Sequence, residues 1–226
     1  EKIGKTLFKH WFVDFEFPWN FKTNEVDLAN GKPYKSGGGK MVDSGLGEIP
    51  EVWRVKPLGE IILELESGRR QKGGAIDEGV PSIGAENVNG LGYYDYSSTK
   101  FVSEEFFKQM KTGIIKDYDI LLYKDGAYIG RKTMFGKGFP YQKCCVNEHV
   151  FIIRVRDPIT QFYLYFYLEQ PEVTENIRQL NTNSAQPGLN RESLEGFQIL
   201  IPNSNLVKQF SKVAQANINK ILENCL

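Results

Sequence analysis

Both ends of this 226-residue chain carry the spacing of amphipathic helices, and this pairing constrains the fold more than any other feature. At the start, Ile3, Leu7 and Trp11 recur every four residues, the period of one helix face. At the end, residues 203–226 place apolar side chains three and four positions apart, with Ser204 as a candidate N-cap. Neither helix has a stop signal at its outer end, so we expect both to continue beyond the sequence.

The first helix leads into an unusually aromatic stretch. Residues 5–18 contain five aromatic side chains, although chain ends are usually polar. We expect this cluster to be buried, packed on the last helix or on the body; the alternative is that it only closes an edge of the core. Asn217 falls on the expected seam of the last helix, where one polar residue can set the register of paired helices. The residues expected to pack the helices together are Leu7, Trp11, Val207, Phe210, Ala214, Asn217 and Ile221.

The pattern between the ends divides the chain into segments. Residues 1–18 are expected to end a helix, and the glycine-rich residues 19–47 to be a linker of extended and turn structure. Residues 48–202 are expected to form the compact body, and 203–226 to begin another helix. Within the body the pattern predicts strands at 80–88 and 144–155, a helix at 103–110, a hairpin at 117–135, a buried helix at 159–170, a helix at 172–180 and a strand before Pro202. This mixture predicts an α+β fold.

Composition excludes several classes of protein. No apolar run reaches the roughly 20 residues that cross a bilayer, and the N-terminus does not resemble a signal peptide. Three cysteines, with Cys144 and Cys145 adjacent, make a poor disulfide framework. We therefore expect a reducing, cytoplasmic setting. With only two histidines and no metal-ligand spacing, no metal site is expected.

The charges balance overall but not locally. Residues 122–156 contain seven basic and two acidic residues, whereas residues 40–67 contain three basic and six acidic ones. A polyanionic partner would use the first segment, because the local field matters more than the net charge. On composition alone, solvated surface charge is the favoured interpretation.

No catalytic motif appears in the sequence. His10 and His149 fall in a helix end and a predicted strand, where a structural role is the common one. The glycine-bearing stretches 37–47 and 126–131 match neither a dinucleotide-binding loop nor a phosphate loop. We therefore predict no catalytic residues.

The loops are instead rich in side chains that form hydrogen bonds. Arg and Lys pair with guanine O6 and N7, and Gln pairs with adenine N6 and N7. One such loop is weak support because loops are generally polar, but four of them favour nucleic-acid binding. The candidate DNA contacts are Arg69, Arg70, Gln71, Lys72, Lys124, Tyr128, Arg131, Lys132, Lys137, Gln142, Lys143, Asn181, Thr182, Ser184 and Gln186.

Four stretches of this sequence resemble one family. "LFKHWFVDFEFP" and "GKPYKSGGGKMVDSGLGEIPEVWRVKPLGEI" resemble the central conserved region and domain entry of type I restriction–modification specificity (S) subunits. "YDILLYKDGAYIGR" resembles the strand pair of that family, and "NTNSAQPGLNRESLEGFQILIP" its closing segment. Two positions depart from the pattern: Tyr118 stands where a glycine commonly precedes the aspartate, and Asn203 stands in place of the second proline of a more usual pair.

The resemblance implies a fold and a function. It implies a target recognition domain, with a twisted mixed or antiparallel sheet and helices, flanked by long helices that form an antiparallel coiled-coil arm. It implies that the domain reads half of a split site in double-stranded DNA. Methyltransferase (M) subunits, which carry S-adenosylmethionine and methylate adenine, and DNA-cleaving restriction (R) subunits would be its partners. The chain itself would be non-catalytic and bind no cofactor.

Two other functions are compatible with the pattern. The helical ends would suit a protein-interaction module that dimerises without binding DNA, and self-association through these ends is a further expected contact. A small enzyme with an unmarked carboxylate site is the third alternative.

Overall fold

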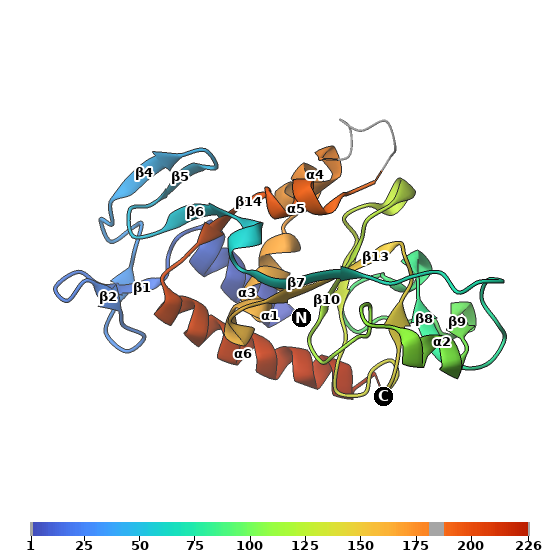
Figure 1. Ribbon diagram of the computed structural model, residues 1–226. Helices are drawn as coiled ribbons and strands as arrows, with labels where there is room; N and C mark the ends of the chain where they lie inside the picture. Colours follow the sequence, from blue (N-terminus) through green and yellow to red (C-terminus); the bar gives the residue numbers. More distant parts are fainter. Residues whose placement is uncertain (1, 181–187, 226) are drawn as a thin grey trace.

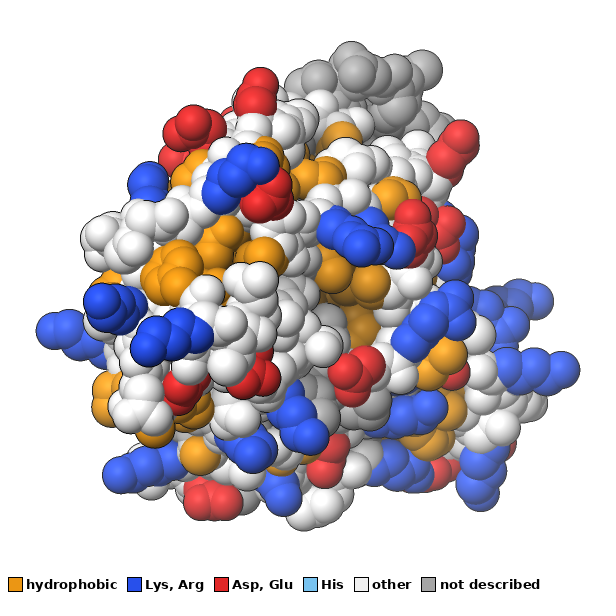
Figure 2. Space-filling view, turned by 90° about the vertical axis from the view of Figure 1, so that its left-hand side faces the viewer, with side chains coloured by type: hydrophobic (Ala, Val, Ile, Leu, Met, Phe, Trp, Pro, Cys, Tyr) orange, Lys and Arg blue, Asp and Glu red, His pale blue; other side chains and the backbone are white. Residues whose placement is uncertain are grey.

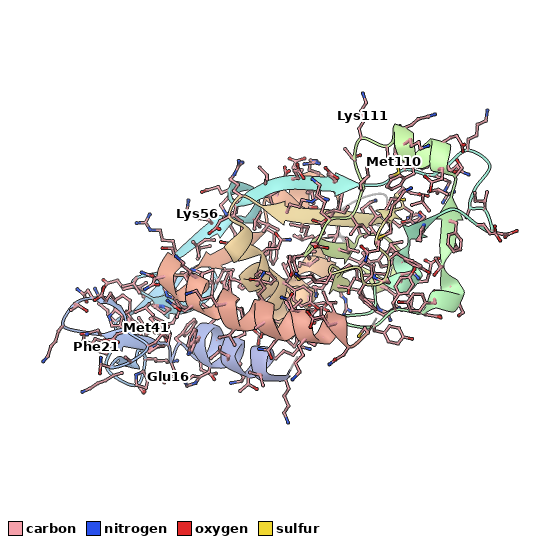
Figure 3. All side chains as sticks on the ribbon, turned by 90° about the horizontal axis from the view of Figure 1, so that it is seen from below. Glu16, Phe21, Met41, Lys56, Met110 and Lys111 are labelled. Atoms are coloured by element: carbon pink, nitrogen blue, oxygen red, sulfur yellow. The ribbon has the colours of Figure 1, made fainter. Side chains whose placement is uncertain are left out.

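The computed structural model describes residues 2–180 and 188–225. Figure 1 shows an elongated molecule, in which a central antiparallel sheet lies over a layer of helices and a small β region occupies each end. Figure 3 places Glu16, Phe21 and Met41 at one end, and Met110 and Lys111 at the other. Within these ranges no helix has the length and apolar character needed to span a membrane.

The central sheet has the strand order β11-β10-β13-β7, and each neighbouring pair is antiparallel. Its two middle strands are apolar runs that are almost entirely buried. The predicted hairpin is confirmed as β10 and β11, whereas the strand predicted at 144–155 is two strands, β12 and β13. The bounds are β7 (Ile62–Ser67), β10 (Ile120–Tyr123), β11 (Lys132–Met134), β12 (Cys145–Val146) and β13 (Val150–Val155).

Helix α3 (Pro158–Leu168) is the apolar centre of the molecule, and it confirms the buried helix expected at 159–170. It packs against α6 (Ser204–Glu223) and α1 (Lys2–Phe8). Helix α1 approaches so closely that a Cβ atom on Gly4 would lie 2.7 Å from the Phe166 ring, so a larger residue there would force the helices apart. A short π-helix, η1 (Lys9–Val13), continues α1.

The aromatic cluster joins the two ends of the chain. The ring centroid of Phe210 on α6 lies 5.5 Å from that of Phe8 and 5.2 Å from that of Phe12. This confirms the expectation that the start of the chain packs on the last helix and on the body. Helices α1 and α6 run in opposite directions along this contact (Figures 1 and 3). The long coiled-coil arm stays a prediction.

The predicted seam of α6 is partly displaced. Its buried stripe includes Ile218 and Leu222, while Asn217 is half-buried and donates from Nδ2 to the Val213 carbonyl of its own helix at 2.8 Å. Asn217 therefore lies beside the seam, because the buried face of the helix passes through the next residue, Ile218. Of the other predicted seam residues, Val207, Phe210 and Ala214 are buried in the core of this chain, and Leu7, Trp11 and Ile221 are half-buried against it.

Residues 19–47 are not the connector that their glycine content predicts. They hold most of a three-stranded antiparallel sheet, in the order β2-β1-β3, and most of the hairpin β4-β5. Trp19, Val26 and Tyr34 fill the space under these strands and are buried, so the segment is part of the core. Pro18, the last residue of the segment expected to end a helix, begins β1. The bounds are β1 (Pro18–Asn20), β2 (Glu25–Val26), β3 (Lys32–Pro33), β4 (Met41–Ser44) and β5 (Gly47–Pro50).

The far end of the molecule has a small core of its own. Strands β8 (Val80–Ile83) and β9 (Lys100–Val102) pair beside β12, and α2 (Glu104–Gln109) covers them. The helix predicted at 103–110 is confirmed, and Ser103 caps it, since its side chain accepts a hydrogen bond from the Phe106 N–H at 3.1 Å. Phe106, Phe107 and Met110 face this core.

The remaining elements complete the body. Strand β6 (Arg54–Pro57) pairs antiparallel with β14 (Gln198–Ile201). Helices α4 (Pro171–Gln179) and α5 (Arg191–Glu195) lie above the sheet in Figure 1. Asn203 rather than Ser204 caps α6, because the Asn203 side chain accepts from the Asn205 N–H at 2.9 Å. The departure from the family's double proline at Asn203 thus supplies a helix cap.

Candidate nucleic-acid interface

The loop after β7 positions the first group of predicted DNA contacts. Gln71 holds the loop in place: its side-chain oxygen accepts from the Ser103 N–H at 2.7 Å and its amide donates to the Gly74 carbonyl. Both ends of Gln71 are thus used within the protein, which favours a positioning role over contact with a base. Arg69 and Lys72 are exposed, and the Arg69 guanidinium lies 5.9 Å from the centroid of the Phe106 ring on α2.

A chain of ion pairs and hydrogen-bonding contacts then ties three loops together. Arg70 contacts Glu148 at 2.6 Å, and Glu148 lies 3.4 Å from Nε2 of His149. On its other side, Nδ1 of His149 lies 2.9 Å from Asp125, which also contacts Lys124 at 2.9 Å. Loops around residues 70, 125 and 148 therefore meet at one place. The backbone N–H of Leu189 donates to the Lys124 carbonyl at 2.7 Å, so the segment before α5 joins them.

No local sequence pattern indicates this chain of contacts. Asp125 and Glu148 are the two acidic residues of the basic segment 122–156, and both lie in it. His149 was predicted to be structural, and it does bridge two carboxylates. The pairing depends on how the β10 and β13 strand ends meet, which no local pattern encodes.

The tip of the hairpin carries the second group. A 3₁₀ turn (Gly126–Tyr128) exposes half of the Tyr128 side chain, and the guanidinium of Arg131 lies 3.7 Å from the centroid of that ring. Arg131 also donates from Nη1 to Oδ1 of Asn89 at 3.0 Å. Asn89 was not among the predicted contacts.

Lys132 lies elsewhere than expected. It is buried in β11, where its ammonium donates to Oγ1 of Thr174 at 2.8 Å and lies 3.4 Å from Glu169. Burial lowers the pKa of Lys132, and the nearby Glu169 carboxylate opposes that shift. Because its charge is already paired inside the protein, Lys132 is removed from the candidate DNA contacts.

The other predicted contacts do not join the ion-pair chain. Lys143 pairs with Glu104 of α2 at 2.6 Å. Lys137 is exposed, and its backbone N–H donates a hydrogen bond to the Asp117 side chain. Gln142 is exposed beside Gly138. Asn181, Thr182, Ser184 and Gln186 lie outside the described residues.

One pocket lies beside the loop after β7, and a larger one lies elsewhere on the molecule. One of about 360 Å³ is lined by Arg69–Gln71, Glu148 and His149, and also by Lys100, which pairs with Glu86 at 2.6 Å. A larger pocket of about 580 Å³ lies apart from it, between α6 and the loop at 116–119, and its lining includes Lys208 and Lys212. No group of His, Cys, Asp and Glu in the described ranges is arranged to hold a metal ion.

Comparison with known proteins identifies the family. The model of the type I restriction modification DNA specificity domain matches residues 50–225, more than half of the chain. The chain belongs to this family.

Individual relatives agree with that assignment. The chain is 27% identical over 228 residues to the type I restriction enzyme MjaIX specificity subunit of Methanocaldococcus jannaschii, covering 99% of the chain and 47% of that protein. It is 26% identical over 167 residues to the MjaVIII specificity subunit of the same organism, covering 70% of the chain and 38% of that protein. The chain thus spans less than half the length of each of these relatives.

Solved structures show the same fold at low sequence identity. The HsdS subunit from Thermoanaerobacter tengcongensis superposes with a TM-score of 0.54 at 16% identity, over 82% of this chain and 41% of that one. A chain from a type I R-M system, solved in a study of complex assembly and conformational transition, superposes with a TM-score of 0.52 at 16% identity, over 82% of this chain and 43% of that one. The α+β target recognition fold predicted from the sequence is therefore confirmed.

Proposed function

We propose that this specificity domain reads one half of a split site in double-stranded DNA, as part of an S subunit that directs M and R subunits to their target. The observation that carries the proposal is the family match over residues 50–225, together with the contacts that bring the loops of Arg70, Asp125 and Glu148 to one place. The chain is proposed to be non-catalytic, with S-adenosylmethionine held by the M subunits.

The distribution of exposed charge supports the location of the interface. Arg69 and Lys72 are exposed side chains at the loop end whose cations contact no carboxylate within ion-pair distance in the described part of the chain. At the opposite end, Figure 2 shows basic and acidic side chains interspersed with apolar patches. A duplex needs phosphate contacts to fix its register before base edges are read, and the loop end offers such cations.

The dimerising protein-interaction module is not favoured. Its main support was an open apolar seam on the terminal helices, and Val207, Phe210 and Ala214 on that seam are buried inside this chain. The family match favours DNA recognition directly.

Salt-dependent DNA binding tests the proposal. In the complete S subunit assembled with its M subunits, replacing Arg69 and Lys72 by alanine should weaken binding to all duplexes about equally. It should also lower the slope of log K against log salt concentration by about two, since each lost phosphate contact removes about one. The measurement is the dissociation constant of a fluorescent duplex between 50 and 200 mM salt.

The matched control changes the same charge at the other end of the molecule. Lys22 and Lys32 are exposed on the β1–β3 region, and their replacement by alanine should leave both affinity and slope unchanged. Equal effects of the two double substitutions would argue against the proposed interface.

A further inference from the structure

Arg131 is held in a single orientation by neutral groups. Its guanidinium stacks on Tyr128 at 3.7 Å from the ring centroid, and its Nη1 donates to Oδ1 of Asn89. The Asn89 amide is itself oriented, because its Nδ2 donates to the Glu86 carbonyl. The backbone of Arg131 is fixed too, since its N–H donates to the Tyr128 carbonyl at 3.0 Å and its carbonyl accepts from the Tyr123 N–H at 2.8 Å.

The charge of Arg131 is nevertheless uncompensated. Among the described residues no carboxylate lies within ion-pair distance of it, whereas Arg70, Arg154 and Arg178 each pair with a carboxylate. Its Nε and Nη2 atoms, which form one edge of the guanidinium, have no acceptor in the described part of the protein. This edge presents two parallel N–H donors in a plane set by the Tyr128 ring.

Such an edge suits two acceptors that lie side by side in one plane. An arginine fork can also bind a phosphate through two hydrogen bonds, but the exposed lysines of the loops can supply phosphate contacts as well. A guanidinium fixed in one plane gains most from a ligand whose acceptors lie in a plane as well. In the major groove, guanine offers two adjacent acceptors, O6 and N7, while adenine offers one acceptor and one donor.

We propose that Arg131 reads a guanine in the half-site, with Tyr128 and Asn89 as positioning residues that hold its guanidinium in the reading plane. The inference rests on the proposed function and adds a base and the residue that selects it. It places a G·C pair at one position of the half-site recognised by this chain.

The test compares duplexes that differ at one position. The complete S subunit with its M subunits is titrated with a set of duplexes in which each base pair of the half-site is replaced in turn. The unmodified protein should lose roughly 10-fold or more in affinity when one particular G·C pair becomes A·T. Arg131→Lys should abolish that preference at this position alone while binding of non-specific DNA stays within about 2-fold, because the positive charge is kept.

Two further variants separate reading from folding. Tyr128→Phe keeps the ring face and should retain the preference, whereas Tyr128→Ala should reduce it; Tyr128 is half-exposed, so neither change disturbs the core. Arg54→Lys makes the same chemical change on the exposed part of β6 and should alter no preference.

The outcomes distinguish this inference from the function on which it rests. If Arg131→Lys leaves every preference intact, or weakens all duplexes equally, Arg131 does not read a base, while sequence-specific binding by the unmodified protein upholds the proposed function. A half-site without a G·C pair would also overturn the inference. If the unmodified protein shows no sequence preference, the proposed function fails together with it.

Discussion

At the scale of single residues, Arg154 fixes the loop before β10 to the central sheet. Its Nε and Nη2 donate to the two oxygens of Asp119, each at 2.6 Å, and Nη2 also donates to the Ile114 carbonyl at 2.8 Å. Nη1 donates to Glu64 on the neighbouring strand. The Asp119 side chain is 3% exposed, so its charge depends on this arginine.

Replacing Arg154 by methionine should therefore destabilise the fold by about 3–5 kcal/mol, the usual cost of leaving a buried charge without its partner. The measurement is urea unfolding at pH 8. Burial raises the pKa of Asp119, and the hydrogen bonds from Arg154 oppose that rise. In the variant burial is opposed only by Lys116, whose backbone N–H donates to Asp119 at 2.8 Å, so the folded state takes up a proton more readily than the unfolded state.

The destabilisation should consequently shrink as the pH falls from 8 to 5, since protonated Asp119 is neutral. A control variant, Arg154→Met with Asp119→Asn, removes the charge and should show no such pH dependence. A loss that is the same at both pH values would contradict this account.

Tyr118, in the same loop, gives a physical meaning to one departure from the family pattern. It stands where a glycine is common, and its φ is 66°, in the left-handed region that glycine adopts without strain. The Tyr118 hydroxyl donates to Oδ1 of Asn219 on α6 at 2.6 Å, and its ring packs on Phe162. These contacts offset the strained backbone and link the loop to the last helix.

At the scale of elements, the last helix shows what hydrophobic periodicity predicts correctly and which residue it misplaces. The pattern identified the helix and most of its buried face, but it placed Asn217 in the seam. Phe210→Ala should cost about 3–5 kcal/mol, because Phe210 is fully buried among Phe8, Phe12 and Phe166. Asn217→Ala on the same helix should change stability by no more than about 0.5 kcal/mol. Thermal or urea unfolding of the two variants, measured side by side, checks the assignment.

If Asn217 were instead a seam residue, its replacement by alanine would change the oligomeric state or shift stability by more than the surface value. Sedimentation of the same two variants distinguishes these cases.

The strands show why the interface was only partly predictable. Lys132 and Arg131 are adjacent cations on one hairpin, and composition treats them alike. β11 is covered on both faces, so every residue of the strand is buried and Lys132 must find a partner inside. Loops rich in polar residues were recognised correctly as loops, but the contacts of Glu148, His149 and Asp125 arise from strand pairing far apart in sequence.

At the scale of the whole molecule, the core crosses the boundary at which the family match begins. The match starts at residue 50, yet Phe8, Phe12 and Phe17 are buried in the same core as α3 and α6. Phe17 stacks on Tyr34 at 4.7 Å and on Trp53 at 5.3 Å between ring centroids. Residues 2–49 are therefore part of one cooperative unit with the matched domain.

A fragment of residues 50–226 should accordingly fail to fold cooperatively. Each buried phenylalanine removed with residues 1–49 costs about 3–5 kcal/mol, and three of them together approach or exceed the total stability of about 5–15 kcal/mol typical of a domain. The measurement is urea unfolding followed by near-ultraviolet circular dichroism, in which the fragment should show no sharp transition, while the full chain should show one.

A control keeps the chain length and removes exposed apolar surface instead. Phe21 and Leu28 lie on the same N-terminal region but are exposed, so their replacement by serine should leave the unfolding midpoint of the full chain nearly unchanged. A fragment 50–226 that unfolds in one sharp transition near the full-chain midpoint would show that the aromatic cluster is an appendage. Restoration of that transition when residues 1–49 are supplied as a separate peptide would instead support a single shared core, because the peptide would return Phe8, Phe12 and Phe17 to their places against α3, α6 and Trp53.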